Sequence, residues 1–228
     1  MEIKSVTNIS KKAENQDNFW SAILDVEGKE VGILCVCDGM GGLNDGARAS
    51  EIVVRRVRES FLETGSDVGL GEVISNANDF IRESSGQKKS GTTCVVLVCV
   101  DGRFLVYNVG DSRCYHWNKE GNFVRQITED HTVIEKYKRE GREITPEIER
   151  KYKNVLTRCV GASKVAKYDI YEGTYHSGDS FLVCSDGFWH TISDKDFLSG
   201  EIDNIDHVVQ RCMMLGETDN ITACVLKV

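Results

Sequence analysis

Proline and long apolar runs are nearly absent from this sequence of 228 residues. The single proline, Pro146, lies in the charged stretch 141–154, which we expect to form an exposed excursion. No apolar run approaches the roughly 20 residues that a helix needs to cross a bilayer. Residues 1–5 have the pattern of neither a signal peptide nor an anchor. We therefore expect no membrane association and a cytoplasmic location.

Basic residues are in the minority, with 28 Lys and Arg against 36 Asp and Glu and a formal net charge of −8. A surface of that sign repels the phosphate backbone, so we expect no nucleic-acid partner. The hydrophobic share of 40% and the charged share of 28% are those of an ordinary globular protein. At this length, and without a repeat or linker, we expect a single domain over residues 1–228.

A Cys-x-x-Cys pair is missing, although the chain has nine cysteines. An odd number cannot pair completely, and the nearest spacings are Cys35-x-Cys37 and Cys94-x₄-Cys99. Inside apolar runs, where most of these cysteines lie, a thiol behaves as a small hydrophobic group. We expect reduced core cysteines rather than disulfides or a zinc site.

Short apolar runs divided by turns predict an α+β chain. The expected helices are 44–63, capped by Asn44 or Asp45, then 69–84, 133–140 and 203–215. The expected strands are 3–9, 18–24, 31–37, 93–100, 103–109, 113–117, 122–126, 168–175, 180–184 and 221–228. The four strands between 93 and 126 have the pattern of an antiparallel meander. The helix over 69–84 has an apolar stripe, including Phe80, that we expect to face the core.

The stretch around Asp38 is the most informative part of the sequence. Val31–Cys37 is apolar throughout, which is typical of a strand covered on both faces. Asp38 ends it and is followed by three glycines in four residues, so the backbone can approach whatever the carboxylate binds. Three further aspartates stand at the ends of apolar elements: Asp17, Asp186 and Asp219.

Hard carboxylate oxygens in this setting favour Mg²⁺ or Mn²⁺ over zinc. For any one aspartate alone, capping a turn is the simpler interpretation. An unpaired carboxylate beside an apolar strand is costly, however, unless it meets a cation. A dinucleotide loop is excluded, because a G-x-G-x-x-G pattern from Gly39 fails at Asn44 and Asp38 would repel a pyrophosphate.

Eight ordered elements make the chain resemble the PP2C (PPM) family of metal-dependent serine/threonine phosphatases, above all its small bacterial members. They are Lys12-x-x-Asn15-Gln16-Asp17, Asp38-Gly-Met-Gly-Gly42, Ser90-Gly-Thr-Thr93, Asn108-Val-Gly-Asp-Ser-Arg113, Thr128-Glu-Asp-His131, Leu156-Thr-Arg158, Ser185-Asp-Gly187 and Asp219-Asn220. The resemblance implies two packed antiparallel β-sheets flanked by helix pairs, an αββα sandwich.

The same resemblance implies the site. Asp38 is the central catalytic ligand and bridges two tightly bound Mn²⁺ or Mg²⁺ ions, with the Gly39 carbonyl on one of them. Asp186 and Asp219 complete the other, and Asp17 acts mainly through water. A water between the ions is activated by them and attacks phosphorus. Asp111 helps to hold a weaker third ion with Asp186; its alternative is an ion pair with Arg113.

Two positions depart from familiar members of the family. Met40 replaces a histidine thought to protonate the leaving group, and Lys12 replaces an arginine that grips the phosphate. His131 and Arg158 are expected to be structural, and the other histidines (116, 176, 190 and 207) show no metal-ligand spacing.

The function expected from this set is hydrolysis of phosphoserine and phosphothreonine in proteins by a monomer. Its expected partners are phosphoproteins, including a serine/threonine kinase. One alternative is a catalytically silent phosphoprotein-binding domain of the same fold. The other is a small-molecule phosphatase.

Overall fold

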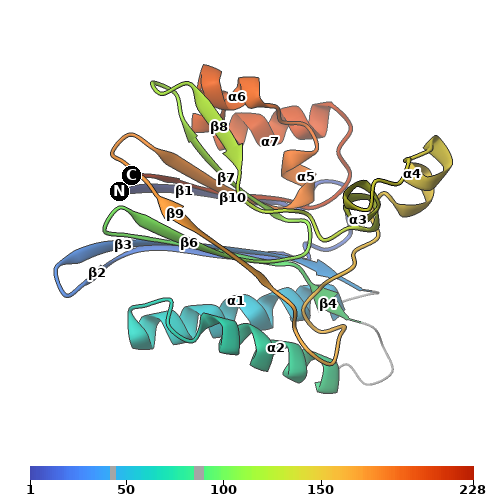
Figure 1. Ribbon diagram of the computed structural model, residues 1–228, viewed down its shortest axis with the longest axis horizontal. Helices are drawn as coiled ribbons and strands as arrows, with labels where there is room; N and C mark the ends of the chain where they lie inside the picture. Colours follow the sequence, from blue (N-terminus) through green and yellow to red (C-terminus); the bar gives the residue numbers. More distant parts are fainter. Residues whose placement is uncertain (42–44, 85–89) are drawn as a thin grey trace.

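The computed structural model describes residues 1–41, 45–84 and 90–228. The described strands form two antiparallel sheets, packed face to face with helices on both outer sides (Figure 1). One sheet has the order β1–β11–β10–β7–β8, and the other β2–β3–β5–β6–β9 with β4 paired to β3. The predicted αββα sandwich is confirmed.

The first sheet contains β1 (Glu2–Asn8), β7 (Arg113–Asn118), β8 (Phe123–Gln126), β10 (Ser180–Cys184) and β11 (Ile221–Lys227). The second contains β2 (Asp17–Val26), β3 (Lys29–Met40), β4 (Gly91–Thr92), β5 (Cys94–Val100), β6 (Arg103–Val109) and β9 (Asp169–Thr174). Helices α1 (Asp45–Thr64) and α2 (Leu70–Ser84) cover the second sheet, and α6 (Asp194–Ser199) and α7 (Ile205–Met214) cover the first (Figure 1).

Strand β3 shows why the sequence forms these layers. Its residues Ile33, Cys35 and Cys37 lie in the core under α1 and α2. The alternate residues, Leu34 and Val36, lie in the core between the two sheets. Successive side chains of a strand point to opposite faces, so a strand buried on both sides must be apolar throughout. The interpretation of Val31–Cys37 as such a strand is confirmed.

The predicted meander between residues 93 and 126 is wrong in one respect. Strands β5 and β6 pair in the second sheet, but β7 and β8 pair in the first, so the chain changes sheets after Val109. Gly110 makes this crossing, with φ of +107° and with Thr93 so near that a Cβ would meet its Cγ2 at 2.6 Å. The crossing brings Asp111 to the junction of the two sheets.

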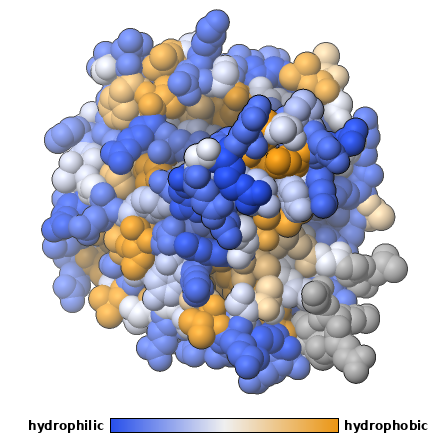
Figure 2. Space-filling view, turned by 45° about the vertical axis from the view of Figure 1, so that its right-hand side comes forward, coloured by the Kyte–Doolittle hydropathy of each residue, from blue (hydrophilic) through white to orange (hydrophobic). Residues whose placement is uncertain are grey.

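Several helices differ from expectation. The excursion 141–154 contains α4 (Pro146–Tyr152), which projects from the body beside α3 (Val133–Arg139) (Figure 1). Figure 2 brings that end of the molecule forward, and hydrophilic side chains crowd the middle of this face. The predicted helix 203–215 is a 3-10 turn (Glu201–Asp203) followed by α7. The short α5 (Asp186–Trp189) and α6 were not expected.

Phe80 was wrongly placed in the core. It is 39% exposed, and the Arg56 guanidinium lies 4.7 Å from its ring centre instead. Helix α1 begins at Asp45, while Asn44, the alternative cap, and Gly42 lie outside the described residues, as does most of the polar loop 84–91. Within the described ranges, the helices are too short or too polar to cross a bilayer.

Candidate active site

Asp17 and Asp38 lie directly opposite each other in the β2–β3 pair. Side chains in such a pair share one face, where two like charges repel each other. Asp17 is buried, with 5% exposure, and its Oδ2 accepts a hydrogen bond from Ser185 Oγ at 2.8 Å. Its Oδ1 is buried without a hydrogen-bond partner in the part of the chain that is described.

The backbone around Asp38 is held by its neighbours. The N–H of Asp38 donates to Thr93 Oγ1 at 2.8 Å, and Thr92 Oγ1 donates to the Asp38 carbonyl at 2.9 Å. Gly39 is packed against the backbone of Gln16 and Gly46, where a Cβ would collide with the Gly46 carbonyl. The glycine after Asp38 is therefore required for this close approach.

Asp111 is held by the ring of Trp189, whose Nε1 donates to the Asp111 carbonyl at 2.9 Å. The Arg113 guanidinium lies over the same ring, 3.4 Å from its centre. Arg113 does not serve as the partner of Asp111, the alternative considered from the sequence. It binds both carboxylate oxygens of Asp130, at 3.0 and 2.8 Å.

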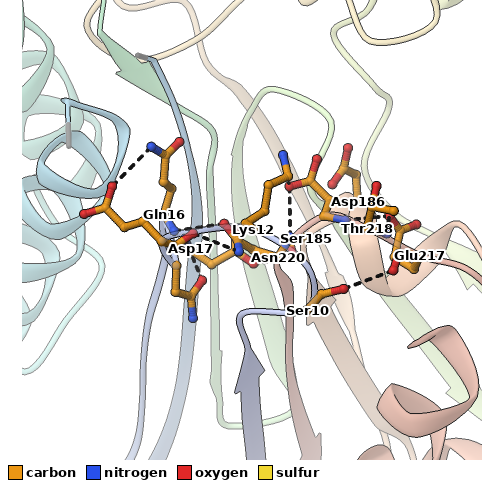
Figure 3. Close-up of polar contacts among 12 residues, drawn as sticks. Ser10, Lys12, Gln16, Asp17, Ser185, Asp186, Glu217, Thr218 and Asn220 are labelled. Atoms are coloured by element: carbon orange, nitrogen blue, oxygen red, sulfur yellow. Dashed lines mark hydrogen bonds and ion pairs between the residues drawn. The ribbon is translucent and has the colours of Figure 1, made fainter. Parts of the chain in front are cut away.

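Asp186 and Asp219 lie next to the ends of two strands of the first sheet: Asp186 begins α5 just after β10, and Asp219 lies just before β11. Lys12 comes from the N-terminal segment (Figure 3), and its Nζ lies 2.8 Å from Asp219 Oδ1. Asn220 fastens that segment, because its Oδ1 accepts the N–H of Gln16 at 2.9 Å.

A cavity of about 240 Å³ lies where these segments meet. Five of the predicted ligands and the predicted phosphate-binding lysine line it: Asp38, Gly39, Asp111, Asp186, Asp219 and Lys12. Asp17 is buried and is not in the lining. The sequence did not single out Gln16, Thr93, Asn154 and Leu156 as lining residues, although all but Asn154 lie in quoted motifs.

Burial and mutual repulsion raise the pKa values of these carboxyl groups. Burial raises the pKa of Asp38 well above that of an ordinary aspartate, and Asp17, Asp186, Asp111 and Asp219 raise it further. Burial likewise raises the pKa of Asp17 and of Asp111 to about 7. Such crowding of negative charge is stable in the ionised form only beside a cation.

The donor set fits divalent ions with oxygen ligands. Besides Asp17 Oδ1, the Oδ1 of Asp186 is buried without a hydrogen-bond partner among the described residues. Over the same residues, no three His, Cys, Asp or Glu side chains form a group that could hold an ion unaided. Mg²⁺ and its close analogues suit such a site, because they retain several waters beside one or two carboxylates.

The sequence profile of the family described as "Protein phosphatase 2C" matches residues 6–219. The chain belongs to the protein phosphatase 2C family. The family predicted from the motifs is thus confirmed. The predicted enzyme class, a metal-dependent protein phosphatase, is confirmed with it.

Individual PP2C relatives agree with this assignment. "Serine/threonine phosphatase stp" of Listeria welshimeri is 29% identical over 214 residues, 86% of this chain and 84% of the relative. The S. agalactiae serine/threonine phosphatase structure has a TM-score of 0.88 and 25% identity, covering 100% of this chain and 99% of the other. The catalytic domain of phosphatase PstP, solved with two manganese ions, has a TM-score of 0.77, 24% identity and coverage of 98% and 96%.

His131 and Arg158, which were predicted to be structural, do not line the cavity and contact Asp169 instead. Arg158 Nη1 binds Asp169 Oδ1 at 2.6 Å, and His131 Nε2 lies 3.0 Å from Asp169 Oδ2.

Two residues beside the site were not identified from the sequence. Glu217 and His190 contact each other 3.0 Å apart, beside Asp219 and Asp186 respectively. The spacing of His190, four residues after Asp186, was the only signal in the sequence.

Proposed function

We propose that this PP2C chain hydrolyses phosphoserine and phosphothreonine in proteins, with two tightly bound Mn²⁺ or Mg²⁺ ions and a weaker third. One observation carries the proposal: Asp38, Asp111, Asp186 and Asp219, from both sheets, line a single cavity. Asp17 is paired with Asp38 across the neighbouring strands β2 and β3.

Each carboxylate has a distinct part in the proposal. Asp38 and the carbonyl of Gly39 would supply oxygen ligands to the two tight ions. Asp186 and Asp219 would hold one of these ions, and Asp17 would act through water. Asp111 and Asp186 would hold the weaker ion. Once bound, the ions supply an activated water nucleophile and positive charge against the phosphoryl oxygens.

Lys12 is proposed to bind the phosphate. Hydrogen bonding to Asp219 raises the pKa of Lys12, so its ammonium stays charged. That ammonium lies at the cavity, 2.8 Å from Asp219 Oδ1, and can attract a phosphate dianion. Met40 also lines the cavity, but a thioether cannot deliver a proton to the leaving group.

The proposed substrates are phosphoproteins, including a serine/threonine kinase. A monomer is part of the proposal; all proposed ligands come from one chain, so the site needs no residue from a second copy. All nine cysteines are free, and eight of them are buried. Reduced thiols support a cytoplasmic location, because cytosolic proteins keep cysteines reduced.

Release of phosphate from phosphoserine and phosphothreonine peptides with Mn²⁺ tests the function. The proposal predicts turnover that EDTA removes and that Asp38→Asn abolishes. A silent binding domain would retain phosphopeptides without releasing phosphate. A small-molecule phosphatase would turn over sugar phosphates faster than phosphopeptides. Either result would contradict the proposal.

A further inference from the structure

Glu217, two residues before Asp219 in the chain, contacts several other segments (Figure 3). Its Oε1 accepts the N–H groups of Thr218 and Asp219 at 2.7 and 2.8 Å. Ser10 Oγ donates to its carbonyl at 3.0 Å, and its Oε2 lies 3.0 Å from His190 Nδ1. One side chain therefore fixes the loop that carries Asp219 and connects it to the segment after α5.

His190 extends this connection to Asp186. Its N–H donates to the Asp186 carbonyl at 3.0 Å, and its Nε2 lies 4.0 Å from Asp186 Oδ2. The imidazole also packs edge-on against Trp189, with 4.4 Å between ring centres. The ring thus stands between Glu217 and Asp186, in contact with both.

We propose that Glu217 and His190 are positioning residues that set the affinity of the ion site formed by Asp186 and Asp219. This inference rests on the proposed function, which assigns these two aspartates to one ion. Neither Glu217 nor His190 is proposed as a ligand. Groups that orient metal ligands in this way typically change metal affinity about 10- to 100-fold when they are removed.

The burial of the pair distinguishes it from an ordinary surface contact. The side chains of His190 and Glu217 are 24% and 12% exposed. The chain offers a matched surface pair in His207 and Glu201, which lie 3.9 Å apart with exposures of 62% and 33%. Exposed pairs of that kind contribute little, since water screens them and both side chains lose freedom.

Calorimetric titration of the metal-free protein with Mn²⁺ tests the inference. The variants are Glu217→Ala, His190→Ala, their double mutant and His207→Ala as the control. His190→Asn is the rescue variant, because the asparagine amide can donate to Glu217 from near the position of Nδ1. Thermal unfolding in EDTA shows whether each variant is folded.

We expect each alanine variant to weaken one of the two tight Mn²⁺ sites about tenfold while the other tight site is kept. The double mutant should lose no more than either single variant, since the two residues act as one unit. His190→Asn should recover part of the affinity, and His207→Ala should bind as the unmodified protein does.

Unchanged Mn²⁺ affinity in both alanine variants would overturn the inference. An equal loss of all ions with a lower unfolding temperature in EDTA would also overturn it, because the pair would then be merely structural. If the unmodified protein itself binds no Mn²⁺, the proposed function is wrong. That result can be distinguished from the two outcomes above, in which the unmodified protein does bind Mn²⁺.

Discussion

His131 accepts the backbone N–H of Gly110 through Nδ1 at 3.0 Å. Since Nδ1 is the acceptor, Nε2 carries the proton and donates to Asp169 at 3.0 Å. Burial lowers the pKa of His131, although Asp169 opposes this, which favours the neutral ring. The relationship matters for the site because Gly110 begins the crossing that carries Asp111.

Replacing His131 by alanine should therefore disturb both stability and turnover. The N–H of Gly110 would lose its buried acceptor, at a cost of about 1–3 kcal/mol in the free energy of unfolding. Displacement of Asp111 should lower kcat at saturating Mn²⁺. Urea unfolding and steady-state kinetics measure the two effects. Arg158→Ala is the comparison, with a smaller expected loss because Arg158 is half-exposed. Unchanged stability of His131→Ala would contradict this account.

Asp38→Asn should separate stability from activity. The substitution removes a charge that Asp17, Asp111, Asp186 and Asp219 all repel. We expect turnover to fall more than about a hundredfold, because the shared ion ligand is lost. We expect the metal-free variant to gain about 0.5–2 kcal/mol in unfolding free energy. Denaturant unfolding in EDTA checks the second effect. A metal-free variant less stable than the unmodified protein would show that Asp38 has a structural role.

The stability of the metal-free protein should decrease as the pH rises from about 5 to about 7.5. Burial raises the pKa of Asp17 and of Asp111 to about 7 in the folded chain, against about 3.9 when unfolded. Between these values the folded state binds more protons than the unfolded state, so each rise in pH favours unfolding. Each carboxylate contributes on the order of 1–3 kcal/mol.

Chemical denaturation in EDTA across this pH range measures that slope. Asp111→Asn should flatten the slope, whereas Asp194→Asn, at an exposed position, should not. The lowered pKa of His131 acts in the opposite direction, and comparison of variants cancels that contribution. An identical slope for Asp111→Asn would show that Asp111 does not titrate in this way.

The spacing of apolar residues predicted most helices and strands, because buried positions recur along the chain with the period of a helix or a strand. The run Val31–Cys37 could be assigned to a doubly covered strand from hydrophobicity alone, but the strand continues through Asp38 to Met40 instead of ending at Asp38. The choice of sheet after Gly110 could not be predicted, since either sheet accepts an apolar strand. Phe80 was misplaced because helical spacing shows an apolar stripe but not which residues at its margin stay exposed.

The site was predictable only as far as its residues lie in family motifs. Those motifs placed Asp38, Asp111, Asp186 and Asp219 at one cavity, as the structure has them. The contact between His190 and Glu217 joins residues 27 positions apart, and no periodicity signals it. Such contacts depend on how α5 and the loop before β11 pack, which only the three-dimensional structure shows.

Lys12 provides the sharpest test of how this site binds phosphate. A guanidinium forms two parallel hydrogen bonds with a phosphate, whereas an ammonium is a compact, mobile charge. We expect Lys12→Ala chiefly to raise KM for a phosphopeptide, because the ions provide most transition-state stabilisation. Lys12→Arg should lower KM. Mn²⁺ affinity should not weaken in Lys12→Ala, since the ammonium that competes for Asp219 is removed. Lys11→Ala, at the exposed neighbouring position, is the control. An unchanged KM for Lys12→Ala would show that Lys12 does not bind the phosphate.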